Sequence, residues 1–106
     1  MPKYLLQASY TADGLRGLRK DKASGRRDAV SQAVETLGGK LEAFYFAFGA
    51  DDVVAITDMP DNASAAGIAL AASGSGLVRT RTTPLLTLEE ADQALQKSVS
   101  YRPPGH

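Results

Sequence analysis

Apolar and polar positions along the chain mark four short segments that predict β-strands. Residues 3–10, 40–48, 52–58 and 77–85 are rich in aromatic, aliphatic or β-branched side chains, and glycine, proline or aspartate lies between them. The second and third segments are separated only by a short turn around Gly49-Ala50-Asp51, which predicts a hairpin.

Helical spacing appears between the first two strands. Leu15 and Leu18 are three residues apart and predict a short helix within residues 11–22. Ser24 is placed to cap a longer helix that ends at about Leu37, before the pair Gly38-Gly39. Its apolar stripe follows the i, i+3, i+4, i+7 pattern at Val30, Ala33, Val34 and Leu37.

Two further helices follow from their start signals. Asp61 or Asn62 can cap an alanine-rich helix over residues 62–73, just after Pro60. The stretch 87–90, TLEE, has the hydroxyl and carboxylate of a capping box and predicts a last helix to about Lys97.

The order strand, helix, strand, strand, helix, strand predicts an α+β fold of the ferredoxin-like βαββαβ type. It has a four-stranded antiparallel sheet with both helices on one face, and an extra C-terminal helix. We expect one domain over residues 1–97 and a flexible tail over residues 98–106.

The open face of such a sheet must be covered, because the second strand is apolar on both sides. One face carries Phe44, Phe46 and Phe48 and the other carries Tyr45, and the sequence leaves open which of them faces outward. Exposed apolar patches mark partner surfaces, so we expect a homodimer that forms sheet to sheet. The alternative is that the tail or the last helix folds back over this face.

Composition removes several classes of function. Lysine plus arginine equals aspartate plus glutamate at 12 each, which argues against non-specific nucleic-acid binding. The 106-residue chain has no cysteine, and its one histidine is the last residue, His106, so we expect no metal site and no cofactor. No apolar run has the length of a membrane span or a signal peptide, and we expect a cytoplasmic protein without a membrane partner.

The chain resembles the GYD-domain family, which belongs to the dimeric α/β-barrel superfamily. The resemblance runs from about Lys3 to Leu86 and rests on five segments: residues 10–14 (YTADG), 37–40 (LGGK), Gly49 with 52–54 (DVV), 60–61 (PD) and 76–80 (GLVRT). The motif that gives the family its name has a glycine, a tyrosine and an aspartate at the hairpin. This sequence has the glycine as Gly49 and the aspartate as Asp52, and it has Asp51 where the tyrosine is expected. The resemblance implies the dimeric barrel fold and assigns no activity.

Several polar side chains are candidates for a binding site. Arg79 and Arg81 share one face of the last strand and can hold a carboxylate or phosphate. Alternatively, they lie on a solvated edge or pair with Glu42 or Asp58 across the sheet. Asp58 ends a strand that has the pattern of a buried one.

A second group of candidates lies near the first strand. Ser9, Tyr10 and Tyr45, with Gln7, can line a pocket between the sheet and the helices. Tyrosine on a strand is also common in a core, with its hydroxyl on a partner.

Acidic and basic clusters have structural explanations. Asp51 and Asp52 sit in a turn, and Asp61, which forms a second acidic pair with Asp58, fits a helix cap. Paired carboxylates also serve acid–base chemistry or bind a divalent cation. The basic residues between 16 and 27 alternate with aspartates and fit a solvated helix face.

Three functions remain for this chain. The first is a homodimeric protein that binds a small molecule or acts as an accessory protein. The second, which the resemblance to the dimeric α/β-barrel superfamily implies, is a cofactor-independent oxygenase or isomerase that acts on a small aromatic or carbonyl compound. The third is a structural partner module that binds a different chain through the open face of the sheet. The absence of an ordered histidine or cysteine favours the first, and the sequence does not identify the ligand.

Overall fold

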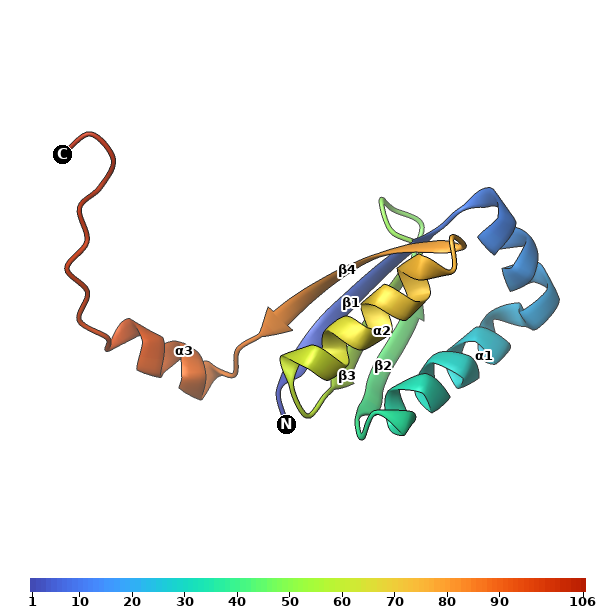
Figure 1. Cartoon of the computed structure of the whole chain (residues 1–106), viewed down its shortest axis with the longest axis horizontal. Helices are drawn as coiled ribbons and strands as arrows, with labels where there is room; N and C mark the ends of the chain where they lie inside the picture. Colours follow the sequence, from blue (N-terminus) through green and yellow to red (C-terminus); the bar gives the residue numbers. More distant parts are fainter.

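The computed structural model describes all residues, 1–106, and contains one four-stranded sheet (Figure 1). The elements in chain order are β1 (Lys3–Tyr10), α1 (Ala12–Thr36), β2 (Lys40–Phe46), β3 (Val53–Asp58), α2 (Asn62–Gly74), β4 (Val78–Leu85) and α3 (Leu88–Leu95). The strands are antiparallel in the order β2-β3-β1-β4. The predicted ferredoxin-like α+β fold with an additional C-terminal helix is therefore confirmed.

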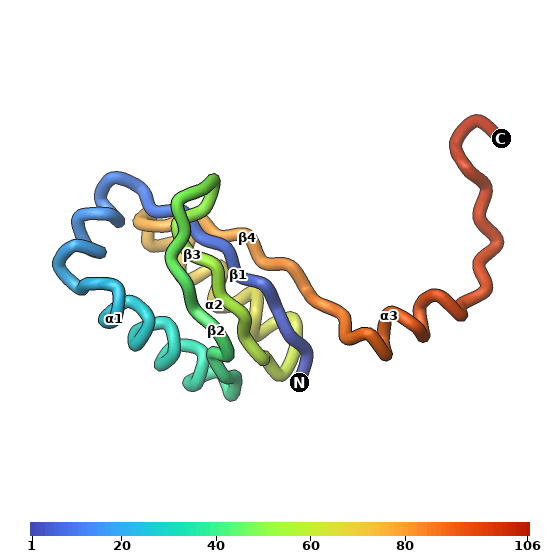
Figure 2. Tube along the Cα trace, turned by 180° about the vertical axis from the view of Figure 1, so that it is seen from behind, coloured from blue at the N-terminus to red at the C-terminus, as the bar shows by residue number.

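Both main helices lie on one side of the sheet. Helix α2 packs along β4, and α1 packs along β2. Figure 2, seen from behind, places the strands in front of α2 and shows no helix over their other face. The sheet therefore has a helix face and an open face.

The register of β2 decides which aromatic residues face the helices. Phe44 and Phe46 are paired with Ala55 and Val53, which are buried under the helices, and the two phenylalanine rings meet edge to face. Tyr45 lies on the open face opposite Val54 and is 70% exposed. A β-bulge between Leu41 and Ala43 shifts the alternation of β2, and such a shift has no reliable sequence signal.

The hairpin closes earlier than the sequence predicted. Strand β2 ends at Phe46 instead of residue 48, because the Ala47 N–H already donates to the Asp52 carbonyl at 2.8 Å. Phe48 therefore lies in the hairpin loop, fully exposed.

A small core joins the two helices to β1. Tyr4, Val34, Met59 and Ala65 are buried together, and Val30 and Ile68 pack against them at the edge. The Tyr4 hydroxyl donates to the Asn62 side-chain oxygen at the start of α2. A buried tyrosine ring with a bonded hydroxyl fixes α2 on the sheet.

Helix α1 is kinked at one residue. Lys22 has φ 67° and ψ 167°, a conformation that is rare for a residue with a side chain. The predicted separation into a short and a longer helical piece is thus present as a kink within α1. The break falls at Lys22, two residues before Ser24, so Ser24 is not the cap that the sequence suggested.

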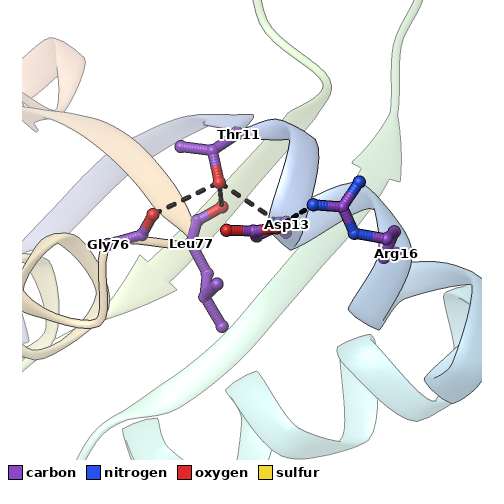
Figure 3. Close-up of polar contacts among 6 residues, drawn as sticks. Thr11, Asp13, Arg16, Gly76 and Leu77 are labelled. Carbon is purple, nitrogen blue, oxygen red and sulfur yellow. Dashed lines mark hydrogen bonds and ion pairs between the residues drawn. The ribbon is translucent and has the colours of Figure 1, made fainter.

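The start of α1 is held against Gly76 and Leu77, the two residues before β4, by contacts of Thr11 and Gly14 that we call the clamp (Figure 3). The Thr11 N–H donates to the Leu77 carbonyl at 3.0 Å, and the Thr11 hydroxyl bonds the carbonyls of Gly76 and Leu77 at 3.2 Å. The Thr11 oxygen also accepts from the Gly14 N–H at 3.2 Å, which caps the helix. A Cβ on Gly14 would lie 2.0 Å from the Leu77 oxygen, so this contact requires glycine.

The predicted caps of α2 and α3 are confirmed. The Asp61 carboxylate accepts from the Ser64 N–H at 2.8 Å, and this bond lowers the pKa of Asp61. Thr87 and Glu90 form the capping box of α3. Beyond β4, however, α3 and the following residues extend away from the sheet (Figure 1), so within one chain they do not fold back over the open face.

Substituting two glycines of α1 tests the clamp. Gly14→Ala places a methyl group against the Leu77 carbonyl, and overpacking of this kind costs about 1–3 kcal/mol. Gly17→Ala meets no atom within 4 Å and gains helix propensity, so it stabilises by up to about 1 kcal/mol. Urea unfolding of both variants measures the difference. Equal effects of the same sign would contradict the close contact at Gly14.

Candidate functional site

A cavity of about 370 Å³ lies between the helix face of the sheet and the two helices. Its floor is formed by β1, β2, β3 and β4, through residues that include Leu6, Ala8, Phe44, Val53 and Val78. Its walls come from α1 and α2, through residues that include Gly17, Ala29, Ala33, Ala71 and Ala72. Small side chains on both helices leave the space between them unfilled, and a volume of this size suits a small ligand.

The cavity lining is apolar with a few polar groups. The Ser75 hydroxyl already bonds the Ala72 carbonyl and the Leu77 N–H, and the Thr80 hydroxyl bonds Ser73. Tyr10 brings a phenol from the end of β1. Asp21 and Arg26 are the only charged residues of the lining, one on each side of the kink in α1.

Of the residues predicted to form a site, the structure places only Tyr10 in this cavity. Ser9, Tyr45, Asp58, Arg79 and Arg81 lie on the open face instead. The expected pocket of Tyr10 with Gln7, Ser9 and Tyr45 is therefore wrong as a grouping. The reason is the period of a strand: Gln7 and Ser9 differ from Tyr10 by an odd number of positions and point to the opposite side.

One polar cluster on the open face surrounds Asp51. Its carboxylate, 13% exposed, accepts from Gln7 Nε2 and from Ser9 Oγ at 3.3 Å each, and it pairs with the Arg81 guanidinium. The Ser9 hydroxyl also reaches the Ala50 carbonyl at 3.1 Å. Asp51 thus fastens the hairpin to β1 and β4.

The second aspartate of the hairpin has a similar role. The Asp52 carboxylate accepts from the Tyr10 N–H at 2.8 Å, and the Asp52 N–H donates to the Ala8 carbonyl at 2.8 Å. Both hairpin carboxylates are therefore engaged in tertiary hydrogen bonds. This supports the structural explanation of the acidic turn, although the partners lie on neighbouring strands and not within the turn itself.

Lys3 organises a second polar cluster at the other end of the open face. Its ammonium group lies 2.8 Å from Asp58 and 2.6 Å from Glu42. The hydrogen bond to Asp58, followed by that to Glu42, raises the pKa of Lys3 above its ordinary value of 10.5. Asp58 therefore acts as a partner of Lys3 on β1, outside the cavity.

The two arginines of β4 share one face, as the sequence indicated. They do not pair with Glu42 or Asp58, because Arg79 and Arg81 lie opposite Ser9 and Gln7, whereas both carboxylates lie at Lys3, at the other end of β1. Arg81 pairs with Asp51, whereas Arg79 is exposed and takes part in none of the ion pairs. An anion site inside the cavity cannot use either of them, since both point to the opposite side of the sheet.

Sequence reasoning missed the two charges at the cavity. Arg26 was assigned with its neighbours to a solvated helix face, and Asp21 was treated as an interruption of that basic stretch. The available signal was the set of small residues on the same helical segments, which predicts space beside them.

No group of three or more histidine, cysteine, aspartate or glutamate side chains is arranged to hold a metal ion. No helix combines the length and the apolar character needed to cross a membrane.

These features define a ferredoxin-like α+β domain with an apolar cavity between its helices and its sheet. The family model described as GYD domain matches residues 4–95, and the chain belongs to the GYD-domain family. The match includes the whole of α3. Neither a curated protein nor a solved structure matches the chain.

The Lys3 cluster has a testable dependence on pH. Because the folded-state pKa of Lys3 is raised, its stabilising effect is complete below pH 10.5 and is lost as the pH rises through the higher folded value. We expect Lys3→Met to be less stable than the wild type at neutral pH, and the difference to shrink in strong alkali. Urea unfolding across this range measures it, with Lys40→Met, outside all ion pairs, as the control. A difference that is independent of pH would contradict the assignment.

Proposed function

We propose that this GYD-domain protein is a homodimer that binds a small molecule in the cavity between its sheet and its helices. The observation that carries the proposal is the cavity itself, which has 14 hydrophobic residues among the 20 that line it. Apolar clefts with a few convergent polar groups are the usual form of ligand sites. Tyr10, Asp21 and Arg26 are the polar groups that remain available to a ligand.

The dimer is supported by the open face. Leu5, Val54 and Ile56 lie at its centre and are only half buried, and Tyr45 stands beside them. Only ten of the 106 residues are buried, so one chain alone encloses a small core. A second copy packed on this face by a two-fold axis removes the apolar centre from water, and the polar clusters of Asp51 and Lys3 form its rim.

Tyr10 is the observation that favours the second candidate, a cofactor-independent enzyme acting on a small aromatic or carbonyl compound. Its phenol can donate to a carbonyl oxygen within the cavity. Asp58, which the sequence offered as a site residue, lies on the opposite face and is held by Lys3. The carboxylate that does line the cavity, Asp21, faces Arg26. The positions of these residues therefore fit a protein that binds its ligand without a reaction better than they fit an enzyme.

Native mass spectrometry at graded collision energies tests this proposal. We expect a dimer that carries a reproducible extra mass after gentle purification. Ala72→Leu fills the cavity from α2 and should remove the extra mass, whereas Ala66→Leu, exposed on the same helix and outside the lining, should retain it. A monomer would contradict the dimer, and an extra mass that persists in Ala72→Leu would contradict the cavity as the binding site.

A further inference from the structure

We propose that the cavity ligand is a small amphipathic anion, with an apolar body and one acidic group such as a carboxylate. Arg26 binds the acidic group, and Asp21 is the counter-ion that the ligand displaces. This inference rests on the proposed function, since it names the ligand class for the same cavity.

The kink in α1 creates the charged mouth of the cavity. In a straight α-helix, residues five positions apart are separated by about 140° around the axis, so their side chains do not meet. The unusual backbone at Lys22 changes this direction and brings the Arg26 Nη1 to 3.7 Å from the Asp21 carboxylate. Rare backbone conformations of this kind are concentrated at functional sites.

Arg26 is held weakly and is free to bind a ligand. Its distance to Asp21 is longer than a hydrogen bond, and Asp21 is 48% exposed, so the pair contributes little to stability. The Arg26 side chain is 32% exposed, and apart from Asp21 the lining that it borders is uncharged. A planar donor at the edge of an apolar cavity matches a carboxylate attached to an apolar body.

Two related dyes separate the charge from the apolar part of the ligand. Anilinonaphthalene sulfonate carries an acidic group, and phenylnaphthylamine has the same aromatic body without it. We expect Arg26→Gln to weaken binding of the sulfonate by about tenfold, the value of one lost hydrogen bond to a charged group, and to leave the neutral dye unchanged. Asp21→Asn should strengthen binding of the sulfonate, because it removes a competing negative charge.

The neighbouring Arg27 provides the matched control. It lies outside the cavity and pairs with Asp28, so Arg27→Gln should leave both dyes unchanged. If Arg26→Gln and Arg27→Gln have the same effect, or if Asp21→Asn does not strengthen sulfonate binding, the anion inference is overturned while the cavity remains a binding site. If Ala72→Leu leaves both dyes bound as tightly as Ala66→Leu does, the proposed function itself fails.

A different observation supports a second proposal, about the segment 86–101, which we call the C-terminal arm. We propose that the arm packs on a second copy of this chain, so that two arms are exchanged within the dimer. In Figures 1 and 2 the arm stands clear of the sheet and of α1 and α2. Leu88, Leu95, Val99 and Tyr101 are between 71% and 87% exposed on it.

The arm cannot be stable in this form in water. An isolated helix of eight residues is too short to persist, even with the capping box at Thr87, unless its apolar side is packed. The family match extends to residue 95 and therefore includes α3 in the domain. The helix thus has the properties of a domain element whose packing surface lies outside its own chain.

Surface area and charge identify the partner as a second copy. The chain exposes 7590 Å², whereas a monomer of its mass exposes about 5,700 Å². The excess is ample for one side of a standard dimer interface, which buries about 800 Å² per partner.

The arm leaves from β4, whose open face carries the unpaired Arg79, and the first turn of α3 is acidic through Glu89 and Glu90. An exchange of arms allows these opposite charges to attract each other across the interface.

Charges placed on the two sides of α3 test the exchange in the full chain. Leu88→Glu with Leu95→Glu interrupts the apolar side and should weaken dimerisation by at least about tenfold. Gln93→Glu with Gln96→Glu adds the same charge at one position of α3 and at its C-cap, leaves both leucines in place and serves as the control. Sedimentation velocity over a dilution series measures both dissociation constants.

The outcomes separate the arm from the dimer. If the two double variants dimerise as tightly as each other, the arm proposal is overturned and the sheet-to-sheet dimer stands. If the wild type is a monomer at every concentration, both the arm exchange and the proposed dimer fail.

Discussion

The alternation of side chains along β1 is the constraint on which the rest of the structure depends. β1 lies between β3 and β4, so its two faces set what each side of the sheet can do. Tyr4, Leu6 and Ala8 point to the helices and form the core and the cavity floor. Lys3, Gln7 and Ser9 point the other way and hold the polar clusters of the open face. The cavity and the open face are therefore separated by one layer of backbone.

The cavity exists because the helices are held at the sheet but do not fill the space between them. Thr11 and Gly14 hold the start of α1 against Leu77, and Tyr4 holds the start of α2 through Asn62. Between these attachments the helices present mainly glycine and alanine. The kink at Lys22 carries α1 around the space and sets two charges at its mouth. The binding that we propose for this cavity needs no strong nucleophile, which agrees with a chain that lacks cysteine and has histidine only at its end.

Sequence patterns predicted the elements of the fold well, since their signals are local. Asp61, Thr87 and Glu90 cap the helices that they were expected to cap, because a capping side chain bonds backbone within three residues of itself. The position of the candidate site residues in space could not be predicted in this way. Tyr10 is in the cavity, but Ser9, Tyr45, Asp58, Arg79 and Arg81 are not, since the face of each depends on strand register and on a bulge in β2. Asp58 pairs with Lys3, which is 55 residues away in the sequence, and local sequence patterns do not predict pairs at such a separation.

The sequence by itself determined the order of strands and helices, their caps and the absence of thiol chemistry, because each of these follows from neighbouring residues or from composition. Only the tertiary structure decided which aromatic residues of β2 face the helices and which carboxylates are held by Lys3 and Arg81. It also decided that Arg26 meets Asp21 at the mouth of a cavity and that α3 stands apart from its own chain. These features depend on backbone geometry and on contacts between segments, and local sequence patterns do not specify either.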